Sequence, residues 1–336
     1  MHYSDYLQLE KILGAQQPES DRQGQPAHDE MLFIVIHQAY ELWFRQLLFE
    51  TDSVIGILGR PALNDNSPEL QTIVHRLSRC ATILKVLVHQ IDIMETMTPM
   101  DFLDFRDKLR PASGFQSWQF KLLEARLGLK YEHRYGQEYY LSQLRQPEID
   151  LIRSAEEGAS LLQLLNGWLE RMPFLVGAEA DIFWSDYRQR YQQSLTEVEK
   201  GNLAYFDAVL QPRKGGASDK EKEPRSLSPA ACRAAIFIML YRGYPLLQLP
   251  FQMLHQLLEI DEQLSTWRFR HMSMVHRMIG TRIGTGGSTG KDYLGAALQR
   301  HHLFREIAAL TSFLIERRRL PALSPEMERG LGFSAP

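Results

Sequence analysis

The sequence predicts an all-α protein, and three observations support this prediction. Apolar residues recur at the three- or four-residue spacing of a helix along most of the 336-residue chain, with one stripe over 32–48 and another over 239–260. The alternation of apolar and polar residues that marks strands is scarce. Capping and turn residues fall where the stripes are interrupted. We therefore expect mostly antiparallel helices in one domain over 1–336.

Helix boundaries can be placed at several points. Thr98 followed by proline is typical of an N-cap with proline in the first turn, and 111–114 has the composition of a turn that ends this helix. A further helix covers about 116–127 and stops at the glycine that follows. We also expect a small helical insert at about 130–175 and a mobile linker at about 211–228, where glycine, proline and charge occur without apolar periodicity.

The composition excludes several classes of protein. With 44% hydrophobic and 24% charged residues, the chain can bury a substantial core. A net charge of -3 disfavours nonspecific nucleic-acid binding, which needs a basic surface to displace counterions. The N-terminus has no basic start followed by an apolar core, and no apolar run reaches transmembrane length. We therefore expect a cytoplasmic protein that binds neither nucleic acid nor membrane.

If the histidines hold a metal, a single side chain must do so. No histidine has Glu three residues upstream, and His-Glu-x-x-His is absent, which disfavours two common helical metal sites. His271 and His276 lie roughly 140° apart around a helix, so they cannot hold one metal from one face. One of them alone would suit an axial haem ligand. Cys80 and Cys232 form no haem-attachment motif, so any haem would be bound without a covalent bond.

The neighbours of His271 make one face of its helix apolar, as the plane of a porphyrin requires. Trp267 and Val275 lie at i−4 and i+4, and Met274 and Met278 at i+3 and i+7. A plain core face has the same pattern. On spacing alone, a core or surface histidine with satisfied hydrogen bonds is the more frequent explanation.

A second histidine, His37, shares its helix face with aromatic and acidic residues. Phe33, Tyr40, Glu41 and Phe44 lie at helical spacings from it. Its imidazole could therefore meet a flat heteroaromatic ligand. The alternative is a core histidine bonded to Glu41 or to a backbone carbonyl.

An arginine in the helix after Thr98 is a candidate carboxylate clamp. Phe102 and Arg106 lie one turn apart, and Ser113 lies in the turn that follows. A guanidinium offers two parallel N–H groups to a carboxylate, and apolar surroundings strengthen the pair. The alternative is a structural salt bridge to Asp101 or Asp104.

The segment 284–291 is rich in glycine but does not match a phosphate-binding loop. Thr285 stands where the first glycine belongs, and Asp292 follows Lys291 where a hydroxyl residue is required. Its glycines and hydroxyl residues suit a loop that orders over a polar ligand, to which Thr285 offers a donor and an acceptor. A connection with no chemical role is the alternative.

Taken together, these segments resemble the tryptophan 2,3-dioxygenase family, all-α helical-bundle haem proteins of the tryptophan and indoleamine dioxygenase type. Its members cleave the indole C2–C3 bond of L-tryptophan with O2 to give N-formyl-L-kynurenine, the first step of tryptophan catabolism by the kynurenine pathway. The match extends over most of the chain. The matching segments are 3–9, 28–44, 101–106, 111–117 and 267–290.

The resemblance implies roles for individual residues and a non-covalent haem b, ferrous in the active state. His271 would be the axial ligand of the iron, with Trp267 beside the haem. His37 would be the distal histidine that faces the indole N–H and acts in catalysis. Arg106 would clamp the substrate carboxylate, and Thr285 would bind the ammonium or carboxylate group. The other implied substrate-binding residues are Phe33, Ile34, Val35, Ile36, Phe102 and Ser113, and Ser113 would also lie close to the haem.

The resemblance also implies a homotetramer, arranged as a dimer of dimers. The N-terminal segment 1–20 would contribute Tyr3 and Tyr6 to the site of a neighbouring subunit. Two alternatives stay open, because related enzymes act on substituted tryptophans. One is a haem-dependent monooxygenase of a substituted tryptophan in secondary metabolism. The other is a sensor that binds haem or indole without catalysis.

Overall fold

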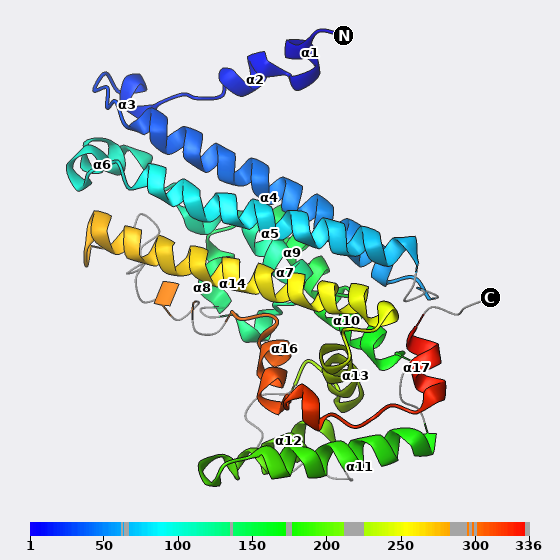
Figure 1. Ribbon diagram of the computed structural model, residues 1–336. Coiled ribbons are helices and arrows are strands. Elements are labelled where there is room, and N and C mark those ends of the chain that lie inside the picture. Colours follow the sequence, from blue (N-terminus) through cyan, green and yellow to red (C-terminus); the bar gives the residue numbers. More distant parts are fainter. Residues whose placement is uncertain are drawn as a thin grey trace. The chain divides into compact units, whose positions relative to one another are not determined.

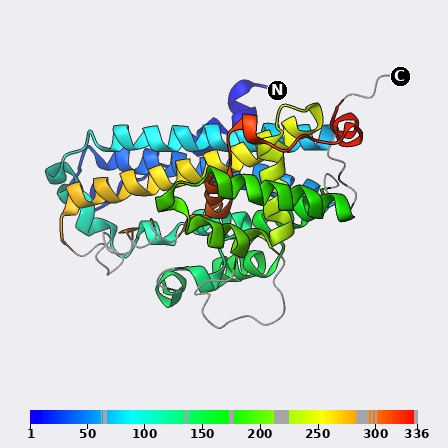
Figure 2. The ribbon, with the colours of Figure 1, turned by 60° about the horizontal axis from the view of Figure 1, so that its bottom comes forward.

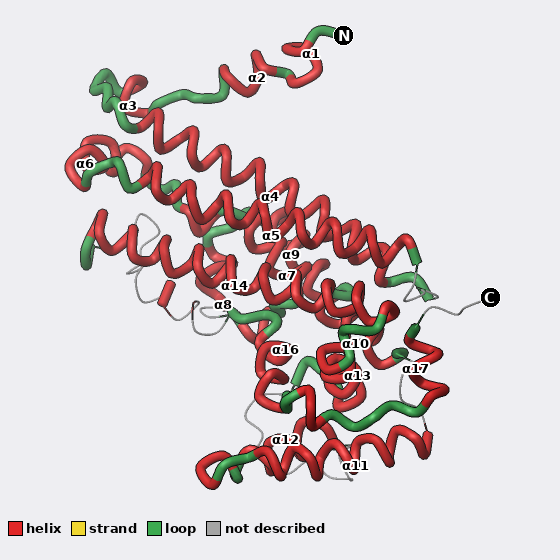
Figure 3. The backbone as a smooth tube through the Cα atoms, in the orientation of Figure 1, coloured by secondary structure: helices red, strands yellow, loops and turns green. Residues whose placement is uncertain are grey.

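The computed structural model describes most of the chain. The described residues are 1–61, 63, 67–134, 137–172, 177–211, 225–282, 294, 295, 298 and 301–332. Within them every regular element is an α-helix or a short 3-10 helix (Figure 3). This confirms the all-α prediction. No described helix is both long enough and apolar enough to cross a membrane.

Two compact units make up the structure, and each is built from separate stretches of the chain. Unit 1 comprises residues 1–50, 80–158 and 262–302, and unit 2 comprises residues 51–79, 159–261 and 303–336. Three long helices contribute a part to each unit. They are α4 (Glu30–Leu58), α5 (Pro68–Met94) and α14 (Pro245–Ile279). The single domain over 1–336 stays a prediction.

The shorter helices belong to one unit each. Those of unit 1 are α1 (Tyr3–Leu7), α2 (Leu9–Leu13), α3 (Glu19–Arg22), α6 (Pro99–Arg106), η1 (Asp107–Leu109), η2 (Gly114–Gln116), α7 (Trp118–Leu127), η3 (Tyr131–His133), α8 (Gln137–Ser142) and α9 (Gln146–Glu157). Those of unit 2 are α10 (Leu161–Glu170), α11 (Gly177–Ser194), η4 (Glu197–Glu199), α12 (Asn202–Leu210), α13 (Pro229–Leu240), α16 (Arg305–Ala309), η5 (Leu310–Phe313), η6 (Arg317–Arg319) and α17 (Pro325–Leu331). The helices α8, α9 and α10 lie in the stretch expected as an insert. Of the predicted linker, residues 212–224 lie outside the described residues.

Local sequence signals set the ends of α6 and α7. The Thr98 side chain accepts a hydrogen bond from the Asp101 N–H at 3.3 Å, and the Asp101 carboxylate accepts one from the Thr98 N–H at 2.8 Å. This capping box, with Pro99 in the first turn, satisfies N–H groups that an α-helix leaves unpaired. Gly128 ends α7 with a φ of 139°, a conformation that a side chain disfavours. Both predicted boundaries are confirmed.

Within unit 1, parts of the three long helices run side by side. Figures 1 and 2 both show the first part of α4, the second part of α5 and the last part of α14 together, with α6 at the end where α4 begins. The Tyr40 hydroxyl donates to the Leu87 carbonyl at 2.9 Å and so joins α4 to α5. Arg270 of α14 binds Asp92 of α5 at 2.8 Å and Glu95, the residue that follows α5, at 3.0 Å. These contacts hold the helices that carry most of the predicted site residues.

Unit 2 has its own core around α13. This helix is apolar on most faces and packs against α10 and α12. Ser228 caps it by accepting from the Ala231 N–H at 3.2 Å, and the Ser228 N–H donates to Asn166 at 2.8 Å. The fully buried Tyr187 donates its hydroxyl to the Phe313 carbonyl at 2.7 Å. No residue predicted for the functional site lies in this unit.

Candidate functional site

Aromatic side chains from α4 and α6 meet in unit 1. The ring centroids of Phe33 and Phe102 lie 5.8 Å apart, and those of Phe33 and Phe105 lie 5.5 Å apart. Phe102 and Phe105 pack edge to face at 5.4 Å. Met274 and Met278 of α14 pack against the same core. The buried members of this core are Ile36, Met94, Met97 and Phe105. We call Phe33, Phe102 and Phe105 the aromatic cluster.

His37 lies beside the aromatic cluster, with its ring centroid 4.1 Å from that of Phe33. Its Nδ1 lies 2.7 Å from the Phe33 carbonyl oxygen, so Nδ1 carries the proton and donates it. The residue keeps exposed surface. Even so, burial of the ring lowers the pKa of His37. The hydrogen bond to the Phe33 carbonyl and the charge of Glu41 act in the opposite direction, but their effect is smaller. A neutral ring with Nδ1–H has its free lone pair on Nε2.

Glu41, one turn after His37, bonds to the start of α7. The Ser117 hydroxyl donates to one carboxylate oxygen at 2.6 Å. The Gln119 side-chain amide donates to the other oxygen at 2.8 Å and to the Glu41 carbonyl at 3.0 Å. The sequence suggested that His37 could bond either to Glu41 or to a backbone carbonyl. In the structure it bonds to the backbone carbonyl of Phe33. The Glu41 carboxylate serves to hold α4 and α7 together.

His271 is partly buried and lies parallel to an indole ring. Its centroid is 5.2 Å from that of Trp267, with 5° between the two planes. Burial, and to a smaller extent charge repulsion from the nearby His37, lower the pKa of His271 to about 4. Its Nδ1 is buried and has no hydrogen-bond partner among the described residues. The ring is therefore neutral at pH 7. It lies close enough to His37 for a positive charge on that ring to lower its pKa.

Trp267 itself packs among aromatic rings of α4 and α7. Its ring centroid lies 5.1 Å from Phe120, 6.0 Å from Tyr40 and 6.4 Å from Phe44. Burial raises the pKa of Tyr40 to about 12, so its hydroxyl stays protonated as the donor to α5. This packing fixes the indole against which His271 lies.

Arg106 and Ser113 flank the end of α6. Arg106 is the last residue of that helix and is only 5% exposed. Asp101, one alternative partner considered for it, bonds to Thr98 in the capping box. Ser113 accepts from the Phe115 N–H at 3.3 Å, which leaves its hydroxyl proton free to donate elsewhere. Thr285 lies outside the described residues.

The remaining predicted residues differ in exposure. Ile36 is buried in the core of the aromatic cluster, Ile34 is half-buried and Val35 is 45% exposed. Two positions along a helix turn a side chain through about 200°, so Val35 faces away from Phe33. Tyr3 and Tyr6 on α1 are each 70% exposed, and neither α1 nor α2 has a buried residue.

Comparison with known proteins identifies the family of this chain. The family model described as tryptophan 2,3-dioxygenase matches residues 1–314. The chain belongs to the tryptophan 2,3-dioxygenase family. Proteins named tryptophan 2,3-dioxygenase are similar to it over nearly their whole length. They include those of Bdellovibrio bacteriovorus (40% identical, 99% of this chain and 98% of the relative), Alteromonas mediterranea (41%, 99% and 97%) and Xenopus laevis (40%, 98% and 86%).

The donor set fits the haem expected of a tryptophan 2,3-dioxygenase. One histidine nitrogen with a free lone pair in apolar surroundings is enough to hold haem iron. The neutral His271, stacked on Trp267 near Met274 and Met278, meets both conditions. No group of three or more His, Cys, Asp and Glu side chains that could hold a metal occurs in the part of the chain that the structure describes. A porphyrin would supply four further nitrogen ligands itself.

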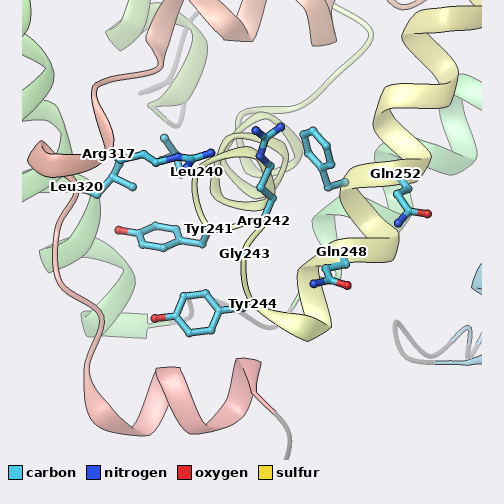
Figure 4. Close-up of a pocket in the computed structure, with 10 residues that line it drawn as sticks. Leu240, Tyr241, Arg242, Gly243, Tyr244, Gln248, Gln252, Arg317 and Leu320 are labelled. Carbon is cyan, nitrogen blue, oxygen red and sulfur yellow. The ribbon is translucent and has the colours of Figure 1, made fainter.

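A pocket in unit 2 is lined by none of the residues that the family resemblance selects. It has a volume of about 570 Å³ (Figure 4). Arg242 lies over the Phe251 ring at 4.7 Å on its wall. The hydroxyl groups of Tyr241 and Tyr244 donate to a backbone carbonyl at 2.7 Å and to Glu328 at 2.9 Å. Both phenols thus form hydrogen bonds to the C-terminal segment, and these hydrogen bonds stabilise the packing of that segment in unit 2.

Sequence reasoning missed several residues that support the family site. Phe120 packs on Trp267, and Phe105 completes the aromatic cluster. The spacing of Phe102 and Phe105, three apart on one helix, was a signal for the latter. Arg268, next to Trp267, binds Glu124, which is distant in sequence. No pattern within either helix indicates that pair.

Proposed function

We propose that this chain is a haem-dependent dioxygenase that cleaves the C2–C3 bond of the indole ring of L-tryptophan with O2 and gives N-formyl-L-kynurenine. Haem b supplies the iron that binds and activates O2, which protein side chains cannot do. Membership of the tryptophan 2,3-dioxygenase family over residues 1–314 carries the proposal. Two neutral histidines support it: His37 lies beside the aromatic cluster, and His271 lies close enough to His37 for the two rings to interact electrostatically.

His271 is the residue that would hold the iron. Its lowered pKa keeps a lone pair free at neutral pH, so ligation releases no proton. Trp267 holds the plane of the imidazole by stacking on it. Ser113, with its free hydroxyl proton, is the proposed donor near both haem and substrate.

The substrate would lie against the aromatic cluster. Phe33 and Phe102 offer flat apolar faces to the indole, and the buried Arg106 offers two parallel donors to the carboxylate. Ile34 and Ile36 are the proposed contacts along the same turn of α4, and the side chain of Val35, which faces away from Phe33, is not one of them. Thr285 is the proposed partner of the ammonium or carboxylate group.

His37 is proposed to orient the indole. Because its Nδ1–H donates to the Phe33 carbonyl, Nε2 is left to accept the indole N–H. No strong general base is needed, since the side chains only hold the C2–C3 bond in position and exclude water. His37 should therefore contribute to turnover without being essential for it.

One experiment tests the reaction and separates its alternatives. The haem-loaded protein is reduced without oxygen and then given tryptophan and O2 labelled with oxygen-18. N-formylkynurenine with two labelled atoms supports the proposal. A product with one labelled atom contradicts it and favours the monooxygenase. Binding of haem and tryptophan without O2 consumption contradicts it and favours the sensor.

The same proposal includes a cytoplasmic homotetramer in which residues 1–20 complete a neighbour's site with Tyr3 and Tyr6. The exposure of both tyrosines supports this arrangement. So does a stripe on α4, where Val35, Leu42 and Phe49 are 45%, 58% and 71% exposed at seven-residue spacing. An exposed apolar stripe of this period is typical of a helix that packs against another protein surface. Light scattering of the purified protein measures the subunit number.

A further inference from the structure

Unit 1 contains a buried cluster of charged side chains next to the helix that carries His271. Glu124 of α7 accepts from Arg134 at 2.7 Å through one carboxylate oxygen and from Arg268 of α14 at 2.9 Å through the other. All three side chains are at most 4% exposed. Arg134 also binds Glu156 at 2.8 Å. We call these four residues the Glu124 cluster.

Arg268 is held from three directions. Besides Glu124, it donates to the His301 carbonyl at 3.0 Å, and its guanidinium lies 6.0 Å from the Phe120 ring centroid. A planar guanidinium with two hydrogen-bonded ends and an aromatic neighbour has little freedom to move. It therefore fixes the turn of α14 that precedes His271 against α7.

The contacts continue from this turn to His271. Phe120, under Arg268, packs on Trp267 with centroids 5.1 Å apart, and Trp267 stacks on His271 at 5.2 Å. A histidine that binds a metal is usually oriented by a hydrogen bond from its second nitrogen. The Nδ1 of His271 has no such partner among the described residues. The plane of this ring therefore depends on packing.

We propose that Arg268 is a positioning residue for the iron ligand: by holding Phe120 and the turn of α14 against Glu124, it fixes Trp267, and Trp267 sets the plane of His271. The inference rests on the proposed function, in which His271 binds the iron. It adds a residue that acts on the iron ligand through Phe120 and Trp267.

Arg134 provides the matched control. It binds the same carboxylate and is equally buried, but two further hydrogen bonds tie it to Glu156 and to the Lys121 carbonyl, which are not on α14. Arg134→Gln and Arg268→Gln each leave Glu124 with one partner fewer. Both should lower the melting temperature of the haem-free protein. Only Arg268→Gln should disturb His271.

Two measurements on the haem-loaded proteins show whether His271 is disturbed. One is the rate at which haem passes to apomyoglobin, and the other is the iron–histidine stretching band of the ferrous protein. We expect Arg268→Gln to shift the band and to speed haem release about 10- to 100-fold, as loss of a supporting contact around a metal ligand does. Arg134→Gln should leave both near the wild-type values.

Arg268→Lys decides the question if Arg268→Gln does not fold. It keeps a cation beside Glu124 but cannot bind the carboxylate and the His301 carbonyl in the same planar way. We expect an intermediate haem release rate and a shifted band. The inference is overturned if haem release and the iron–histidine band change equally in the Arg268 and Arg134 variants, or if the band does not shift in the Arg268 variants. Neither result contradicts the proposed function. A wild-type protein that binds no haem overturns the proposed function as well.

Discussion

The rings of Trp267 and His271 lie parallel, with 5° between their planes and 5.2 Å between their centroids. Trp267→Leu removes this stack and leaves a gap next to Phe120. We expect a loss of about 2 kcal/mol in the free energy of unfolding, typical of a large-to-small change in a packed region. Haem content per subunit should also fall. Trp267→Phe keeps a flat ring and should retain most of the haem, so equal losses in both variants would contradict the role of the ring plane.

Replacing the distal imidazole should separate haem binding from turnover. His37→Ala removes the proposed acceptor of the indole N–H but leaves the His271 side intact. One hydrogen bond contributes about 1 kcal/mol, so kcat/KM for tryptophan should fall about five- to tenfold with haem content unchanged. 1-Methyltryptophan has no indole N–H, so its slower reaction should not fall further in the variant. An equal fall for both substrates would argue against this hydrogen bond.

Arg106 is proposed to bind the substrate carboxylate, and substrates with and without that group separate this role from a structural one. Arg106→Lys keeps the charge but loses the paired N–H groups that match a carboxylate. Loss of such a charge-assisted contact, about 1.5–3 kcal/mol, should lower kcat/KM for tryptophan about 10- to 100-fold. Tryptamine lacks the carboxylate, so its weak reaction should be the same in both proteins. A further loss with tryptamine would show that Arg106 supports the fold instead.

Local features of the sequence predicted the helices well because caps and periodicity act between near neighbours. The Thr98 capping box and the end of α7 at Gly128 are examples. The apolar face around His271 could also be predicted from near neighbours in the sequence. The choice between a ligand and a plain core residue was not, because it depends on what packs against that face. The resemblance to a family supplied this information, and spacing did not.

Partners distant in sequence could not be predicted in the same way. Glu41 lies one turn from His37, and the helical period suggests that they bond. In the structure Ser117 and Gln119, 76 and 78 positions away, take the carboxylate. The pair of Arg268 and Glu124 spans 144 positions. Such contacts follow from the packing of whole helices, which no single segment encodes.

The buried carboxylate of Glu124 should make stability depend on acid pH. Burial alone would raise its pKa, but Lys121, His301 and Arg134 together hold the pKa well below the usual 4.5. The folded state therefore stays ionised where the unfolded chain takes up a proton. The stabilisation is complete above about pH 4.5 and is lost as pH falls toward the lowered pKa.

Glu124→Gln removes this effect and breaks a buried ion pair. We expect it to cost about 3–5 kcal/mol at pH 7, and the gap to the wild type should narrow as pH falls below about 4.5. Urea unfolding of both proteins at several pH values measures the cost at pH 7 and the change of the gap with pH. Glu199→Gln changes an exposed carboxylate that only caps η4 and should cost far less. A gap for Glu124→Gln that stays constant down to acid pH would contradict the lowered pKa.

Phe49 offers a test of association through the stripe on α4. It is 71% exposed, and Leu42 and Val35 continue the stripe at seven-residue intervals. Phe49→Glu would place a charge where an apolar contact is expected, and burying an unpaired charge costs several kcal/mol. Light scattering should therefore show smaller assemblies than the wild type forms. Val198→Glu is the control, because Val198 is 96% exposed and belongs to η4, not to the stripe on α4. If the Phe49 variant keeps the wild-type subunit number, the stripe is not the contact surface. If it dissociates and also loses turnover with haem retained, a neighbouring subunit contributes to the site, as proposed for Tyr3 and Tyr6.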